Sequence, residues 1–127
     1  MPLINKTVIV VEDTYDDMQL VSTILEHSGI KVQVANNGIE CLALIQKISP
    51  ALIVSDLSMP EMDGWEMLKQ LRANPGTESI PIVAVTAYYS VDVAQDAIHA
   101  GFDGYFAKPV SPTNFVASLE AILDSTH

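Results

Sequence analysis

Short β-branched apolar runs alternate along this chain with stretches of helical periodicity, and that alternation limits the fold more than any other feature. The runs are almost continuously apolar, which is typical of strands that are buried on both faces of a sheet. Such strands pair in parallel, and crossover helices cover the two faces. The runs that predict strands are residues 7–11, 31–35, 51–56, 80–85 and 105–107.

A helical pattern follows each predicted strand. In residues 14–28, apolar side chains recur every three or four positions, and Gly29 then predicts the end of the helix. The pair Asn37-Gly38 predicts a turn before the second helical stretch. The later stretches are residues 39–45, 64–73 and 91–100, with a last helix beginning near Pro112. In residues 64–73, Trp65, Leu68 and Leu71 are predicted to face inward. We therefore predict one α/β domain over residues 1–127, with a five-stranded parallel sheet and five helices.

Polar side chains occur where the predicted strands end. Glu12 and Asp13 follow the first strand and Asp56 ends the third, while Thr86 and Lys108 follow the fourth and fifth. Ligands of parallel sheets bind beyond the carboxyl ends of the strands, so we expect these side chains to converge at one edge. Carboxylates there repel one another unless positive charge compensates them. Mg²⁺, which prefers oxygen ligands, would relieve the repulsion together with Lys108.

Each of these residues also has an ordinary structural interpretation when it is taken alone. Asp13 could cap the helix that starts near Thr14, and Asp56 could begin a turn. Thr86 could be a plain strand residue and Lys108 a surface lysine. Their occurrence at successive strand ends of one predicted sheet favours a shared functional site.

Five short motifs surround these positions. They read VVED at 10–13, NGIE at 37–40, SDLSMPEMDG at 55–64, VTA at 85–87 and KP at 108–109. In this order, and over essentially the whole chain, the motifs resemble the receiver domains of the response-regulator family in two-component signalling. The resemblance implies a flavodoxin-like, doubly wound fold with strand order 2-1-3-4-5. It also implies Mg²⁺-dependent transfer of a phosphoryl group to Asp56 from a histidine kinase or a phosphotransfer protein.

The resemblance further implies a role for each matching residue. Asp56 would be the phosphoacceptor and, with Asp13 and the backbone carbonyl of Ser58, a Mg²⁺ ligand. Glu12 would act on the metal through a water molecule. Lys108 would pair with a phosphoryl oxygen as a compact positive charge.

Other implied roles concern the rest of the phosphoryl group and the response to it. The hydroxyl of Thr86 and the backbone N–H of Ala87 would bind the remaining phosphoryl oxygens. Thr86 and Tyr105 would form the switch pair, although Tyr105 could also be plain core packing. The bond between Lys108 and Pro109 would be a cis peptide.

Two variable positions, Ser58 and Tyr88, flank the expected path of a hydrolytic water. Ser58 offers no carboxamide to orient that water, and the ring of Tyr88 could exclude it. We therefore expect slow dephosphorylation. The hydroxyl of Tyr88 could instead hold a water, or its ring could point away and pack against the next helix.

The charge of the chain limits its partners. There are 16 acidic and 6 basic residues, for a net charge of −10, so nucleic-acid binding is not expected. No apolar run reaches the roughly 20 residues of a membrane span, and no signal peptide is recognisable, so a cytoplasmic location is expected. The single cysteine, Cys41, excludes an internal disulfide and is predicted to be buried.

Other functional classes fit less well. A dehalogenase-type phosphatase with an aspartyl-phosphate intermediate normally has a second Asp where Ser58 stands. A flavodoxin-type nucleotide carrier needs a glycine- and hydroxyl-rich loop where residues 12–17 are mostly acidic. A non-catalytic interaction module would leave the acidic cluster unexplained. We expect a signalling switch rather than an enzyme. We also expect the protein to be a monomer or a weak dimer. Because no effector domain follows the last helix before His127, we expect its output to be contact with a downstream protein target or phosphoryl relay to another protein.

Overall fold

A computed structural model describes residues 2–125, and these residues contain one five-stranded parallel sheet in the order β2-β1-β3-β4-β5. This order and the alternation of strands with helices confirm the predicted flavodoxin-like fold class. The central strands lie between two helical layers, which explains their continuous apolar sequence. The strands are β1 Thr7–Val11, β2 Lys31–Ala35, β3 Leu52–Asp56, β4 Ile82–Thr86 and β5 Gly104–Ala107.

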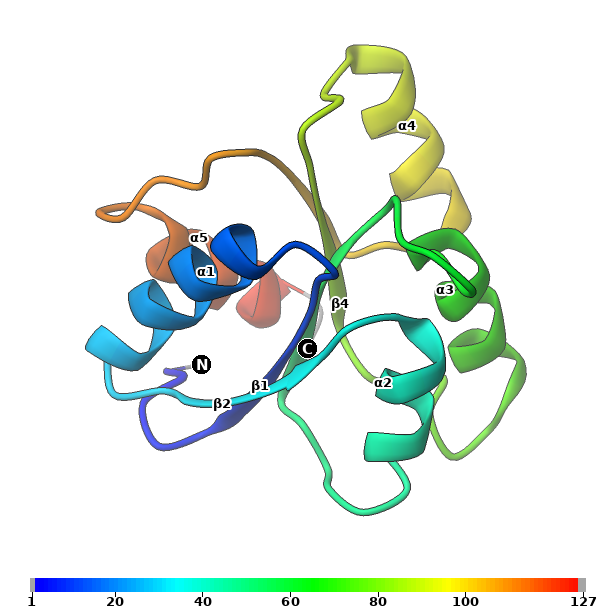
Figure 1. Ribbon diagram of the computed structural model, residues 1–127, viewed down its shortest axis with the longest axis horizontal. Helices are drawn as coiled ribbons and strands as arrows, with labels where there is room; N and C mark the ends of the chain where they lie inside the picture. The colour runs from blue at the N-terminus through cyan, green and yellow to red at the C-terminus, as the bar shows by residue number, and fades with distance from the viewer. Residues whose placement is uncertain (1, 126–127) are drawn as a thin grey trace.

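Helices cover both faces of the sheet (Figure 1). One face carries α1 (Tyr15–His27) and α5 (Phe115–Ser125). The other face carries α2 (Gly38–Leu44), α3 (Gly64–Ala73) and α4 (Val91–Ala100).

Alternation along β1 divides its side chains between two apolar clusters. Val8 and Val10 belong to the cluster under α1 and α5, whereas Ile9 and Val11 belong to the cluster under α2, α3 and α4. Each fully buried aliphatic side chain of this kind stabilises the fold by roughly 1.5–3 kcal/mol. At the edge strand β2, by contrast, Val34 is 49% exposed.

Side chains cap three of the helices at their N-termini. Asn37 Oδ1 accepts a hydrogen bond from the Glu40 N–H at 2.9 Å, and Asp63 and Ser90 cap α3 and α4 in the same way. Such a cap contributes about 1 kcal/mol. The pair Asn37-Gly38, predicted as a turn before the helix, is the cap and the first residue of α2.

Strand β4 begins at Ile82, two residues later than the predicted start. The reason is the guanidinium of Arg72, which donates hydrogen bonds to the carbonyl oxygens of Ile80 at 2.8 Å and of Glu78 at 3.0 Å. The Ile82 N–H in turn donates to Asp103 Oδ2 at 2.9 Å. Side-chain contacts therefore hold the segment before β4, where the sequence pattern predicted a strand.

Two predictions about single side chains have different outcomes. Trp65, predicted to face inward on α3, is only half-buried, and Met67 is fully buried in its place. The buried face of α3 follows the spacing 64, 67, 68, 71, and Trp65 lies one position off that face. The predicted burial of Cys41 is confirmed, and this burial raises the pKa of its thiol to about 12.

A search of the described residues for long apolar helices found none that could span a membrane.

Candidate functional site

The parallel register brings the polar strand ends to one edge of the sheet. Val11 of β1 lies opposite Ser55 of β3, so the residues that follow them, Glu12 and Asp56, are neighbours. The Glu12 N–H donates to the Ala35 carbonyl at 2.9 Å, which extends the β1–β2 ladder by one residue. Thr86 and Lys108 reach the same edge from β4 and β5, because the Lys108 N–H donates to the Thr86 carbonyl at 2.9 Å.

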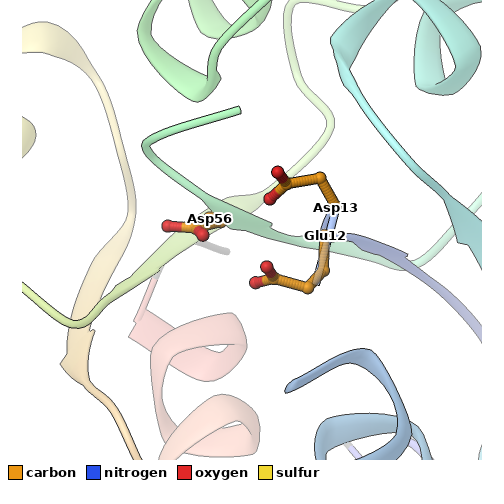
Figure 2. Close-up of side chains that lie close together, drawn as sticks. All are labelled: Glu12, Asp13 and Asp56. Carbon is orange, nitrogen blue, oxygen red and sulfur yellow. The ribbon is translucent and has the colours of Figure 1, made fainter. Parts of the chain in front are cut away.

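Three carboxylates gather at this edge (Figure 2). Oxygen atoms of Glu12, Asp13 and Asp56 all lie within 4.8 Å of one another. Glu12 and Asp56 are buried, and Asp13 is exposed. Burial raises the pKa of Glu12 from its ordinary value; the hydrogen bond from Lys108 opposes the shift, and the charge of Asp56 adds to it. Three hard oxygen ligands on close, mutually repelling carboxylates suit a Mg²⁺ ion.

Asp13 does not cap α1, so that structural alternative is wrong. Thr14 occupies the N-cap position, and no side chain accepts a capping hydrogen bond there. The Thr14 N–H donates to Glu12 Oε1 at 3.1 Å instead. The Asp13 carboxylate therefore remains directed to the acidic cluster.

The two oxygens of Asp56 have different surroundings. Oδ1 accepts hydrogen bonds from the N–H groups of Leu57, at 2.7 Å, and Ser58, at 3.3 Å. Asp56 is the last residue of β3, and the two residues that follow it hold its Oδ1. Its Oδ2 faces Lys108, with 3.1 Å between Oδ2 and Nζ, so the backbone N–H groups fix the carboxylate without occupying both oxygens.

Lys108 supplies the positive charge of the site. Its Nζ contacts Glu12 Oε2 at 2.7 Å and Asp17 Oδ2 at 2.8 Å, in addition to Asp56. Burial would lower the pKa of Lys108, but hydrogen bonds to the three carboxylates outweigh burial, and the pKa is raised. The ammonium therefore stays charged. The peptide bond between Lys108 and Pro109 is cis.

Asp17 was not among the residues that the sequence predicted for this site. It lies in the first turn of α1, directly after the acidic end of β1. Asp16 lies in the same turn, so this position did not single out Asp17. Acidic residues in the first turn of a helix are also common for a separate reason, the helix dipole.

Glycine contacts hold the loop between β3 and α3, which carries Ser58. The Gly64 N–H donates to the Leu57 carbonyl at 3.1 Å, and the Gly38 N–H donates to the Met62 carbonyl at 3.0 Å. Asn37 Nδ2 also lies 3.5 Å from Glu61 Oε2. Glu61 adopts a left-handed backbone conformation with φ of 65°. The loop is thus fixed at its end against β3 and against α2.

The remaining predicted residues lie around the end of β4. Thr86 is buried, and its Oγ1 accepts a hydrogen bond from the Tyr88 N–H at 3.1 Å, whereas Ala87 is exposed. Ser58, Thr86 and Tyr88 line one pocket of about 310 Å³, and Tyr88 is 78% exposed.

Tyr105 lies on β5, the strand beside β4. Burial raises the pKa of its hydroxyl, and the backbone of Ser90 opposes that shift. Its ring lies 4.9 Å from the ring of Tyr89, measured between centroids.

Comparisons with known proteins agree on one family. The model for the response regulator receiver domain matches residues 8–120. The polar-differentiation response regulator DivK of Brucella anthropi is 32% identical over 118 residues, which are 93% of this chain and 96% of DivK. The chemotaxis response regulator CheY4 of Vibrio cholerae has a TM-score of 0.85 at 31% identity, covering 93% of this chain and 98% of that one. A Mn²⁺-bound form of response regulator Rcp1 has a TM-score of 0.74 at 25% identity, covering 92% and 91%.

Proposed function

The chain belongs to the response regulator receiver domain family, and we propose that it is a switch that accepts a phosphoryl group on Asp56. The donor would be the phosphohistidine of a histidine kinase or of a phosphotransfer protein. We propose a cytoplasmic location for this protein. Phosphorylation would change the affinity of this protein for a downstream protein target.

One observation carries this proposal: Asp56 Oδ2 lies 3.1 Å from Lys108 Nζ, at the centre of an acidic cluster. In the transfer, an Asp56 oxygen attacks phosphorus while the bond from phosphorus to the donor histidine nitrogen breaks. The histidine leaves with the bonding electron pair. Phosphoryl transfer depends mainly on positioning and on charge neutralisation. The Leu57 and Ser58 N–H groups orient the carboxylate, and Lys108 neutralises charge.

Glu12, Asp13 and Asp56, with the backbone carbonyl of Ser58, would hold Mg²⁺. When bound, the ion supplies positive charge against the carboxylates and the incoming phosphoryl group. Support for a divalent ion comes from the convergence of the three carboxylates and from the related Rcp1, which has a Mn²⁺-bound form. Glu12 would act on the ion indirectly, since its Oε2 is engaged by Lys108.

Thr86 and Ala87 would bind phosphoryl oxygens through a hydroxyl and a backbone N–H. The Thr86 hydroxyl would have to turn from its present contact with the Tyr88 N–H. We propose that this movement reaches Tyr105, which lies on β5 beside β4 and whose ring centroid lies 4.9 Å from that of Tyr89. The switch would therefore pre-exist as an equilibrium that phosphorylation biases.

Acid-labile labelling by acetyl phosphate in the presence of Mg²⁺ tests the proposal directly. The wild-type chain should incorporate one phosphoryl group, and Asp56→Asn should incorporate none. Asp92→Asn, on the exposed first turn of α4, removes the same charge and should label like wild type. Labelling of Asp56→Asn at the wild-type rate would overturn the assignment of the acceptor.

A further inference from the structure

Three carboxylates engage Lys108, and one of them, Asp17, has no role in the proposed transfer. The ammonium of lysine has three N–H donors. The Nζ atom lies 2.7 Å from Glu12 Oε2, 2.8 Å from Asp17 Oδ2 and 3.1 Å from Asp56 Oδ2. Every donor is therefore in use. A phosphoryl oxygen can bind Lys108 only if it shares or displaces one of these partners.

Asp17 is the partner that can be displaced most easily. Glu12 and Asp56 have side chains that are 5% and 10% exposed, and backbone N–H groups hold their other oxygens. The Asp17 side chain is 41% exposed, and Lys108 is its only hydrogen-bond partner within residues 2–125. Its loss from Lys108 would thus cost less than the loss of either buried carboxylate.

The surroundings of Asp17 leave room for this exchange. A hollow of about 200 Å³ lies beside Lys108 and is lined by Asp17 and Leu20 from α1 and by Ala87 from the end of β4. Ala87 is the residue whose N–H would bind the phosphoryl group. The Asp17 carboxylate can therefore move into this space without disturbing the buried core.

We propose that Asp17 is a positioning residue that competes with the phosphoryl group for Lys108 and so sets how readily the phosphorylated state forms. This inference rests on the proposed roles of Asp56 and Lys108. In the unphosphorylated protein, Asp17 holds the lysine. Once a phosphoryl oxygen binds the Lys108 ammonium, Asp17 either loses its ion pair or stays as a like charge beside the phosphoryl oxygens. Both outcomes disfavour the phosphorylated state.

The test compares Asp17→Asn with Asp16→Asn. Both substitutions remove one negative charge from the first turn of α1, but only Asp17 contacts Lys108. Beryllium fluoride serves as a phosphoryl analogue, and its half-saturating concentration is measured at saturating Mg²⁺ from Trp65 fluorescence. Asp17→Asn should bind it about three- to fivefold more tightly than wild type, as expected for a partly exposed ion pair. It should also be labelled faster by acetyl phosphate, while Asp16→Asn matches wild type.

The direction of the change separates this role from a purely structural one. A loosened α1 would weaken binding of the analogue, so tighter binding supports competition for Lys108. Equal affinity in Asp17→Asn and Asp16→Asn, or weaker binding in Asp17→Asn, would overturn the inference. If wild type neither binds the analogue nor is labelled, the proposed function itself is wrong.

Discussion

Gly64 packs against the backbone carbonyl of Asp56 so closely that a side chain at position 64 would collide with it. The contact joins the first residue of α3 to the last residue of β3. The loop between them therefore returns directly onto the candidate phosphoacceptor, and its shape depends on the absence of one methyl group.

Gly64→Ala should lower the free energy of unfolding by about 1–3 kcal/mol, the usual cost of overpacking, and should slow labelling of Asp56. Urea denaturation and acetyl phosphate labelling measure the two effects. Gly76→Ala is the matched control, because its added methyl group would meet only the Asn74 side chain, at 3.4 Å. Similar stability in the two variants would mean that the loop adjusts freely.

Asp13→Ala should weaken Mg²⁺ binding at least tenfold, because it removes one of three carboxylates that lie within 4.8 Å of one another. Titration of Mg²⁺, followed by Trp65 fluorescence, gives the affinity. Asp92→Ala removes an acidic side chain on α4 and should leave the affinity unchanged. An unchanged affinity in Asp13→Ala would place the ion elsewhere.

Thr86→Ala should still be labelled on Asp56 but should lose most of the conformational response. The substitution removes the hydroxyl that contacts the Tyr88 N–H at 3.1 Å and that would turn to the phosphoryl group. Amide hydrogen exchange around Tyr89 and Tyr105, with and without beryllium fluoride, reports the response. Thr23→Ala, on the exposed surface of α1, is the control. A wild-type exchange pattern in Thr86→Ala would count against coupling through this hydroxyl.

Tyr88→Ala should shorten the phosphorylated half-life several-fold if its ring shields the phosphoryl group from water. Tyr88 shares a pocket with Ser58 and Thr86, beside the acceptor. Each tenfold change in half-life corresponds to about 1.4 kcal/mol in the barrier. Decay of labelled protein measures the rate, with the exposed Tyr15→Ala as control. A half-life that stays the same or lengthens removes the shielding hypothesis and leaves the acceptor unaffected.

The sequence was sufficient to predict the sheet and the convergence of Glu12, Asp13 and Asp56, because both follow from short-range patterns. Apolar continuity indicates a doubly covered strand, and a parallel sheet brings all carboxyl ends to one edge. The contact between Asp17 and Lys108 could not be read in this way. It joins residues 91 positions apart through side chains, and nothing local distinguishes Asp17 from its neighbour Asp16.

The start of β4 was mispredicted for a related reason. An apolar residue before Pro81 looks like strand, but Arg72 from α3 binds the Ile80 carbonyl. Helical phase explains the difference at Trp65: one position of rotation moves a side chain from the core to its border. Contacts between residues far apart in the sequence thus determine the start of a strand and the burial of a side chain where the local pattern does not.

The alternation of β1 has a consequence for chemistry as well as for packing. Val8 and Val10 face α1 and α5, and Glu12 continues that series at the strand end, whereas Asp13 continues the opposite one. A slip of β1 by a single residue against β3 would turn its apolar side chains to the opposite faces and, in the same step, move both carboxylates from their places beside Asp56. Such a misaligned chain would lose the packing of its core and the convergence of Glu12, Asp13 and Asp56 together.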